Sequence, residues 1–508
     1  MEQDSRTAHP EAVARRAPLQ TALQMADTGE ALTYAQLTCS AHRIGRALAG
    51  LGLGVGATIA CLMSNAPSLF QVVWAAKNNG WRYVMVGTRL NAADIDYIVR
   101  DSGATALICT ADLASRIVDL RLEPEGIRMI CADGTLPGFC DLRALAAIEP
   151  ATTLPGRKRG ASMLYSSGTT GRPKGVKAML SDVPPEVPPP RHAGLLAAYG
   201  LDSNTVFITA APLYHAAPLR ISMAVQRAGG TVIVMRKFDA EAMLAAIERT
   251  GATHGFFVPT MFQRMLDLPD AVRAQYCVTS MRHAIHGAAP CPVAVKRGMI
   301  DWWGLVIDEL YGGTESIGQT FINAQEWLAH PGSVGRPPPH VQVKIVDAQG
   351  RILPAGETGL IRMRNTQRFA YHGAAASPGA EDYDAEGYAS LGDIGYLDAD
   401  GYLYLTDRSS NMIITGGVNV YPREAEDVLH SHPAIADVAV VGTPDRDLGE
   451  VVTALIVLKQ GYSSDRAMQT GLLDFCVARL SQYKCPRSII FVSDLPRNEM
   501  GKLMKCRV

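Results

Sequence analysis

The sequence predicts an α/β protein in which two helix-covered sheet layers precede a small antiparallel β unit and a small α+β unit. Strand-like and helix-like segments alternate, with short connections, over residues 35–150 and again over 206–286. This alternation is typical of mainly parallel sheets covered by helices. From residue 334 onward the pattern changes to short, hairpin-like strands. The 508 residues, of which 47% are hydrophobic, can fill roughly three compact units at ~150 residues each.

The first layer opens with an amphipathic helix over residues 34–51, in which Ala and Leu recur at helical spacing until Gly52 ends it. The elements expected next are a strand at 57–63, a helix at 67–78, a strand at 83–86, a helix at 92–102 and a strand at 104–109. Residues 52–57 fit a loose GxGxxA pattern. They follow a helix, whereas a dinucleotide fingerprint follows a strand, so we interpret them as a helix stop and a turn.

The second layer and the later units follow the same reasoning. The second layer is expected to contain strands at 206–210, 231–235, 254–258 and 283–286 and a helix at 239–249. The antiparallel strands are expected within 341–347, 359–364 and 395–407. The last unit is expected to contain a short segment at 411–415, the helix 423–431, the strands 435–441 and 451–458, and the helix 472–480. The proline-rich segment 181–191 is either a stiff surface loop or a lid near the site.

Composition excludes several classes of protein. The 48 Lys and Arg residues balance 49 Asp and Glu residues, and the net charge of −1 offers no basic field for nucleic acid. No run reaches the ~20 apolar residues that a membrane-spanning helix needs, and the first residues lack the apolar core of a secretory signal. The ten cysteines contain no CxxC pair, and His283 and His286 lack further zinc ligands at the usual spacing. We therefore expect a cytoplasmic protein with reduced thiols and no structural zinc.

A loop rich in glycine and hydroxyl side chains follows the apolar strand at 161–164. Its glycines let the backbone approach a ligand closely, while four hydroxyls and a lysine surround the same spot, which is the chemistry that a polyphosphate needs. It is not a Walker A loop, because Pro173 and Gly175 stand where that motif requires other residues. The predicted phosphate-binding residues are Ser166, Ser167, Gly168, Thr169, Thr170, Gly171 and Lys174.

This stretch, SSGTTGRPKG, resembles the signature of the adenylate-forming superfamily of acyl-CoA ligases, luciferases and nonribosomal adenylation domains. Further stretches match that family in order along nearly the whole chain, and acyl-CoA ligases are the most similar branch. They are PLYH at 212–215, YGGTE at 311–315, LGD at 391–393, DR at 407–408 with GGVNVYP at 416–422, and PRNEMGK at 496–502.

The resemblance implies a domain organisation. A large N-terminal domain, 1–408, would combine the two α/β sheet layers and the antiparallel β subdomain and would hold the ATP and acyl pocket. A hinge at 409–411 would join it to a small mobile α+β domain, 412–508, that carries a catalytic lysine and a strand lining a thiol tunnel.

The resemblance also implies roles for individual residues. Glu315 would hold Mg²⁺ on the phosphates through oxygen. Lys502 would bridge the substrate carboxylate and the α-phosphate, where charge builds up in the transition state. His215 either lies beside the reacting carboxylate or only lines the pocket. The remaining residues are Thr314 at the catalytic centre; Gly287, Ala288, Ala289, Tyr311, Gly312, Asp393 and Arg408 for adenosine; Gly416, Gly417 and Asn419 for CoA; and Phe257 and Gly313 in the acyl pocket.

The implied enzyme is an acid–thiol ligase that uses ATP, Mg²⁺ and coenzyme A. The expected pocket stretches are rich in Gly, Ala, Phe and Met, which favours a bulky or medium-to-long apolar carboxylic acid. We expect a monomer or homodimer without nucleic-acid partners. The implied reaction has two half-reactions, formation of acyl-AMP from the acid and ATP and transfer of the acyl group to the CoA thiol. Three alternatives stay open: an acyl-AMP ligase that loads a carrier protein, a ligase efficient in only one of the two half-reactions, and a silent acyl- or nucleotide-binding protein.

One position departs from the family pattern. The family usually has Lys-Asp at the hinge, whereas this chain has Ser410 and Asn411. Asn tolerates unusual backbone angles, so rotation at the hinge is retained. The balance between the two half-reactions is the property that this substitution puts in question.

Overall fold

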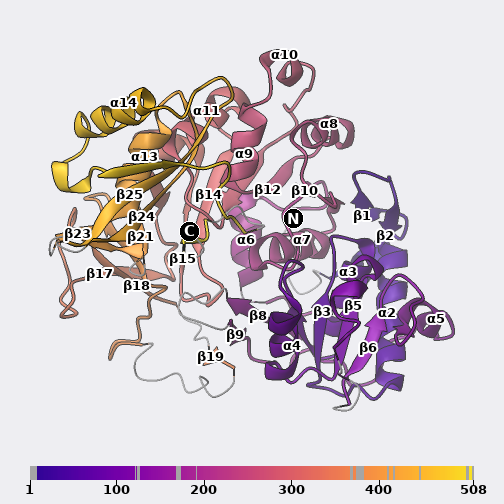
Figure 1. Cartoon of the computed structure of the whole chain (residues 1–508). Coiled ribbons are helices and arrows are strands. Elements are labelled where there is room, and N and C mark those ends of the chain that lie inside the picture. The colour runs from indigo at the N-terminus through magenta and orange to yellow at the C-terminus, as the bar shows by residue number, and fades with distance from the viewer. Residues whose placement is uncertain are drawn as a thin grey trace. The chain divides into compact units, whose positions relative to one another are not determined.

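A computed structural model describes residues 9–120, 122, 126–166, 173–189, 191–365, 370–372, 383–408, 411–415, 418–445, 448–498 and 503–505 (Figure 1). The chain forms two compact units, each assembled from separate stretches. Unit 1 comprises Met1–Phe257, Leu268–Ala284 and Phe369–Gly379. Unit 2 comprises Val258–Asp267, Ile285–Arg368 and Ala380–Val508.

An eight-stranded sheet in unit 1 has the strand order β19-β9-β8-β4-β3-β5-β6-β7. The strands from β8 to β7 run parallel, and β9 and β19 add antiparallel strands beyond β8. Figure 1 shows β9 and β19 beside each other although they are far apart in the sequence. The bounds are β3 Thr58–Leu62, β4 Arg82–Met85, β5 Ala106–Cys109, β6 Arg128–Cys131, β7 Cys140–Asp141, β8 Ala161–Ser166, β9 Lys174–Lys177 and β19 Ala370–Tyr371.

A second group of parallel strands in unit 1 follows the order β12-β10-β11-β1, and the antiparallel strand β2 completes it. The bounds are β1 Thr21–Met25, β2 Ala31–Thr33, β10 Val206–Thr209, β11 Thr231–Val234 and β12 His254–Phe257. The buried strands β10, β11 and β12 read as short apolar runs, which is why the sequence pattern located them, whereas it did not predict β1 and β2.

The helices of unit 1 that the sequence pattern predicts, α2, α3, α4 and α8, begin and end within about one residue of the predicted limits. The pattern did not predict the other helices of this unit. Thr33 caps α2 in a capping box with Gln36, and Gly52 follows the helix with a φ of 96°. The interpretation of residues 52–57 as a helix stop and a turn is thereby confirmed. The bounds are α1 Pro10–Arg16, α2 Tyr34–Gly50, α3 Pro67–Asn78, α4 Ala92–Asp101, η2 Ala111–Arg116, α5 Leu142–Ala147, α6 Arg191–Tyr199, α7 Ala216–Ala228, α8 Ala240–Thr250 and α10 Asp270–Arg273.

The proline-rich segment is held by three arginines of unit 1. Arg157 pairs with Glu186 at 2.6 Å. Arg159 donates to the carbonyls of Val187 and Pro188 at 2.9 Å each, and Arg227 donates to Pro185 at 3.0 Å. These contacts favour the interpretation as a fixed loop over that of a lid.

Unit 2 contains the antiparallel strands that the change of rhythm after residue 334 predicts. A five-stranded sheet has the order β16-β21-β20-β18-β17. A hairpin of β14 and β15 precedes it in the chain. The bounds are α9 Pro259–Leu266, β13 His283–Gly287, α11 Val293–Trp303, β14 Ile307–Gly312, β15 Gln319–Ile322, α12 Ala324–Ala329, β16 Ser333–Gly335, β17 Gln342–Val346, β18 Gly359–Arg364, β20 Asp393–Leu397 and β21 Leu403–Arg408.

The C-terminal part of unit 2 forms a second five-stranded sheet, β23-β22-β25-β24 with β26 beside β25. Apolar residues of the sheet pack against α13 and α14 in one core. Helix α14 begins earlier than the predicted 472–480, because Asp465 caps it by accepting from the Met468 amide. The bounds are β22 Ile413–Thr415, β23 Val418–Val420, α13 Pro422–His430, β24 Ile435–Asp445, β25 Gly449–Leu458, α14 Arg466–Val477, η6 Gln482–Lys484 and β26 Ser488–Phe491.

These elements confirm the predicted α/β fold class with its antiparallel and α+β parts. The division at residues 409–411 stays a prediction. In the part of the chain that the structure describes, no helix combines the length and apolar character needed to cross a bilayer.

Candidate active site

The predicted phosphate loop connects two paired strands of unit 1. Ser166 at the end of β8 lies opposite Lys174 at the start of β9. A Cβ on Gly175 would lie 3.0 Å from the Tyr165 ring and 3.2 Å from the Cβ of His372, so β9 is closely packed there and a larger residue would have to displace these neighbours. Lys174 is exposed. The remaining predicted loop residues, Ser167, Gly168, Thr169, Thr170 and Gly171, lie outside the described residues.

A buried asparagine shapes the segment that carries His215. Asn65 donates to the carbonyls of Ala211 and Met235 and accepts from the Leu213 amide at 2.9 Å. Its carboxamide thereby bonds with the backbone just before His215. The sequence interpretation missed Asn65, because these contacts join residues about 150 positions apart.

His215 itself stands at the N-cap of α7 with an unsatisfied ring nitrogen. Its Nε2 is buried and has no hydrogen-bond partner among the described residues. Burial lowers the pKa of His215 to about 4, so the imidazole is neutral at pH 7. A buried imidazole nitrogen without a partner is suited to a ligand that supplies one. Ala216 and Ala217, the next two residues, are partly exposed and small.

Two neighbouring strands of unit 2 approach closely beside the predicted adenine contact. A Cβ on Gly287, at the end of β13, would lie 2.5 Å from the carbonyl oxygen of Leu310 on β14, so no larger residue fits. The next residue, Ala288, has a φ of 69°, a left-handed conformation that costs energy for a residue with a Cβ. Strained backbone of this kind concentrates at functional sites.

The predicted adenine and ribose residues are in direct contact. Tyr311 on β14 donates its phenol proton to Oδ2 of Asp393, the first residue of β20, at 2.6 Å. Asp393 is buried, and its backbone lies opposite that of Arg408 in the pairing of β20 with β21. The phenol thus orients one carboxylate oxygen. A carboxylate held in this way can accept hydrogen bonds from sugar hydroxyls.

The turn after β14 places a carboxylate over a glycine. A Cβ on Gly313 would lie 2.8 Å from Oε2 of Glu315, so the missing side chain makes room for this oxygen. Ser316 donates to the carbonyl of Thr314 and has a φ of 57°. The turn therefore presents oxygen atoms, the ligands that Mg²⁺ prefers.

Comparisons with known proteins match nearly the whole chain. The family model for AMP-binding enzymes matches residues 10–370, and the model for the C-terminal domain of these enzymes matches 424–502. A feruloyl-CoA synthase of Amycolatopsis is 32% identical over 97% of this chain and 96% of its own length. The long-chain-fatty-acid–CoA ligase FadD13 of Mycobacterium tuberculosis is 31% identical over 93% of this chain and 92% of its own.

The ATP-bound crystal structure of MatB from Rhodopseudomonas palustris superimposes with a TM-score of 0.83 at 27% identity, covering 99% of this chain and 98% of that one. The chain belongs to the AMP-binding enzyme family. The resemblance to the adenylate-forming superfamily is confirmed, and so is the class of enzyme, an AMP-forming acyl-CoA synthetase.

Of the remaining positions predicted for this AMP-binding enzyme, some lie within the described residues and others do not. Phe257 is fully buried at the end of β12, with its ring against Gly255. Asn411 donates to Asp407 at 2.9 Å. Gly312 pairs with Gln319, and Asn419 pairs through its backbone with Ile414. Gly416, Gly417 and Lys502 lie outside the described residues.

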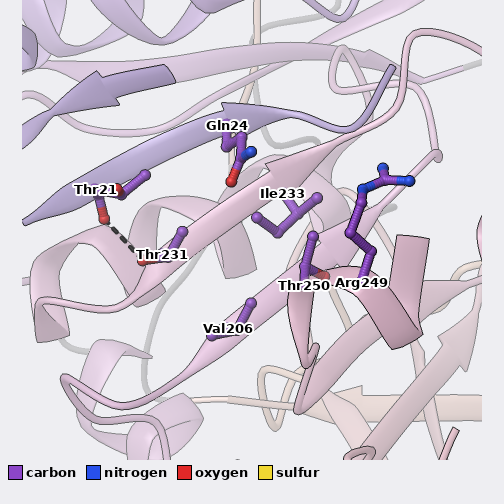
Figure 2. Close-up of a pocket in the computed structure, with 7 residues that line it drawn as sticks. All are labelled: Thr21, Gln24, Val206, Thr231, Ile233, Arg249 and Thr250. Carbon is purple, nitrogen blue, oxygen red and sulfur yellow. Dashed lines mark hydrogen bonds between the residues drawn. The ribbon is translucent and has the colours of Figure 1, made fainter. Parts of the chain in front are cut away.

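Two other features of the AMP-binding enzyme involve none of these residues. His330, Asp398 and Asp400 form the one cluster in the described part of the chain with donors within 4.8 Å of one another, but Asp398 already pairs with His330 and accepts two backbone amides of its turn. A cavity of about 350 Å³ is lined by seven residues, which Figure 2 shows: Thr21, Gln24, Val206, Thr231, Ile233, Arg249 and Thr250. It lies at the amino ends of parallel strands, whereas ligands of α/β sheets bind at the carboxyl ends.

Proposed function

We propose that the protein is an ATP-dependent ligase that converts a bulky or medium-to-long apolar carboxylic acid into its CoA thioester through an acyl-AMP intermediate. The contact between Tyr311 and Asp393 carries the proposal, since it joins two motifs 82 residues apart into one adenosine-binding arrangement. The CoA synthase and CoA ligase among the relatives support CoA as the acceptor, and ATP-bound MatB supports ATP as the nucleotide.

In the first half-reaction, a carboxylate oxygen of the acid attacks the α-phosphorus of ATP, and pyrophosphate leaves. The Tyr311 ring stacks on adenine, Asp393 accepts from the ribose hydroxyls, and Lys174 donates to the phosphates. The ammonium of Lys502 offsets the negative charge that builds up at the α-phosphate. The oxygens of Glu315 and Thr314 fit Mg²⁺, which, when bound, neutralises charge on the departing pyrophosphate.

In the second half-reaction, the thiol of CoA attacks the acyl carbon and AMP leaves. Residues 409–411 act as the hinge, and the strand around Asn419 lines the path of the pantetheine arm. These roles follow from the family's motifs at the same positions. A purified protein that consumes ATP and acid but releases no AMP on addition of CoA would contradict this half of the proposal.

The neighbours of His215 support an acid with a large acyl group. Ala216 and Ala217, the two residues that follow His215, are small and partly exposed, so they take up little space at the start of α7. The acids that relatives use include ferulate and long-chain fatty acids. Pyrophosphate release measured over aromatic, medium-chain and long-chain acids, with acetate as the small comparison, tests the substrate class. Preference for acetate would overturn it.

Two of the alternatives are separated by the same assays. Transfer to a phosphopantetheinylated carrier protein in place of CoA would identify a carrier-loading ligase. Absence of pyrophosphate release with every acid, together with retained nucleotide binding, would identify a silent binding protein.

Lys174→Ala is expected to weaken ATP binding by roughly 10–100-fold, because a hydrogen bond between an ammonium and a phosphate is worth about 1.5–3 kcal/mol. The fold should survive, since Lys174 is exposed on β9. Titration calorimetry with ATP, together with the melting temperature, checks both statements. Lys177→Ala on the same strand is the matched control and should bind ATP like the wild type. Equal ATP affinity in folded Lys174→Ala would remove this lysine from the site.

Asn411→Asp is expected to change the ratio of the two half-reactions. The Asn411 amide donates to Oδ1 of Asp407, whose other oxygen accepts from the Arg423 amide at 3.2 Å. An aspartate would place a second negative charge beside Asp407 and disfavour this arrangement. A bias of ~1.4 kcal/mol changes a population ratio tenfold.

The measurement is acid-dependent pyrophosphate release and, separately, CoA capture of synthetic acyl-AMP, in the wild type and in Asn411→Asp. We expect one rate to fall about tenfold relative to the other. If both wild-type rates sustain overall turnover and the substitution alters neither, Asn411 does not set the balance.

A further inference from the structure

A buried ion pair lies on the strand that carries Tyr311. Lys296 on α11 and Glu309 on β14 meet at 2.7 Å, and their side chains are 0% and 7% exposed. The Lys296 ammonium also lies 5.1 Å from the centre of the Trp327 ring. Neither residue belongs to a motif of the family resemblance, and the mechanism above does not use them.

Burial disfavours the charged form of a carboxylate, and the neighbouring ammonium favours it. Burial alone would raise the pKa of Glu309, but the ammonium of Lys296 holds the pKa below its ordinary range. Two charges taken out of water gain little over an apolar pair of the same volume, and replacing both is often neutral or stabilising. Stability is therefore a weak reason for an ion pair here, and its position in the fold becomes the informative property.

Glu309 and Tyr311 project from the same face of β14, because side chains two residues apart on a strand point the same way. Tyr311 in turn donates to Asp393 at 2.6 Å. Lys296 thus ties α11 to the strand just before the tyrosine.

The preceding strand, β13, reaches the same carboxylate. His286 is fully buried, and its Nε2 lies 3.6 Å from Oε2 of Glu309. Neither ring nitrogen of His286 has a hydrogen-bond partner among the described residues. The following residue is Gly287, where a Cβ would lie 2.5 Å from the carbonyl oxygen of Leu310 on β14. Glu309 thus faces side chains from two elements that contact β14, the helix α11 and the strand β13.

We propose that Lys296 and Glu309 are positioning residues that fix β14 so that Tyr311 and Asp393 bind the adenosine part of ATP. The pair does not touch the ligand. This inference rests on the proposed function, because it presumes that Tyr311 and Asp393 form the adenosine site.

The test compares AMP with inorganic pyrophosphate as ligands of the purified full-length chain. Lys296→Met and Glu309→Gln are expected to weaken AMP binding about tenfold and to leave the binding of pyrophosphate without Mg²⁺ unchanged, because Tyr311 lies on β14 whereas Lys174, the proposed direct contact of the phosphates, lies on β9. General loosening of the fold would weaken both ligands alike and would overturn the inference. Unchanged AMP binding in a folded variant would overturn it as well.

The double variant Lys296→Met with Glu309→Leu keeps the test decisive if a single variant fails to fold. It removes both charges at similar volume and is expected to melt near the wild-type temperature. Its AMP affinity should stay about tenfold weaker, since the directional link to α11 is lost. Recovery of wild-type AMP affinity in this variant would show that the pair has a structural role only.

A matched control comes from another buried ion pair. Arg157 pairs with Glu11 in unit 1, with side chains 14% and 8% exposed. Arg157→Met should lower the melting temperature and leave AMP binding unchanged. If the wild type binds neither ATP nor AMP, the proposed function itself fails. If the wild type binds both and the variants bind AMP equally well, only the positioning role fails.

Discussion

Lys502→Ala is expected to slow acyl-AMP formation by about 10²–10³-fold, the usual effect of removing one preorganised group that stabilises transition-state charge. Thioester formation from supplied acyl-AMP should fall far less. The reason is that the Lys502 ammonium is proposed to contact the α-phosphate and the carboxylate only while the anhydride forms. Acid-dependent pyrophosphate release and CoA capture of synthetic acyl-AMP measure the two steps separately.

Lys505→Ala is the control for distortion of the same segment. Lys505 pairs with Glu426 at 2.7 Å, which attaches the end of the chain to α13. Its loss should lower both half-reactions by a similar factor, because it has no proposed contact with the reacting atoms. A Lys502→Ala variant that loses both steps equally would show that Lys502 supports the fold instead of the chemistry.

Acidification from pH 7 to pH 5 is expected to remove much of the protein's stability. Burial lowers the pKa of His9 and His286 to about 3 and that of His192, His215 and His254 to about 4. Between pH 6.5 and about 4 the unfolded chain binds protons at these rings and the folded chain does not, so stability falls as the pH falls through this window. At pH 5 each ring costs roughly 2 kcal/mol, against a total of ~5–15 kcal/mol for a typical fold.

Urea unfolding at pH 7 and pH 5 tests this, with proton uptake on unfolding as an independent readout. His192→Gln is the informative variant, because the ring is buried and lies in none of the proposed ligand contacts. It should reduce the pH dependence by roughly 2 kcal/mol and the uptake by about one proton. Equal urea midpoints at the two pH values would contradict the prediction.

The motifs that are contiguous in the sequence were predictable with their chemistry. Residues 311–315 carry an aromatic ring, two glycines and a carboxylate within one turn, and the strand and turn that the structure shows there follow from that order. The limits of α2 were predictable to within a residue, because Thr33 caps its start and Gly52 follows its end, whereas the start of α14 was missed although Asp465 caps it.

Contacts between distant positions were not predictable from periodicity. Asn65 follows a strand of one layer and bonds with the backbone before His215, which a pattern of apolar residues does not encode. The pair of Lys296 and Glu309 reads as two ordinary surface charges until α11 and β14 are packed together. A sequence window reports which face of an element is apolar, and it does not report which charged side chains the packing of two elements brings together.

The strand β19 has a consequence for how the chain is made. β9 ends at Lys177, and its outer neighbour β19 ends at Tyr371, so roughly 190 residues are synthesised between the two. At ~5–20 residues per second, the ribosome takes roughly 10–40 s to supply the missing strand. During that time the sheet of unit 1 ends in an edge whose backbone groups are unpaired, and such edges invite pairing with other chains. The nascent protein therefore carries this open edge until almost three quarters of it has left the decoding centre.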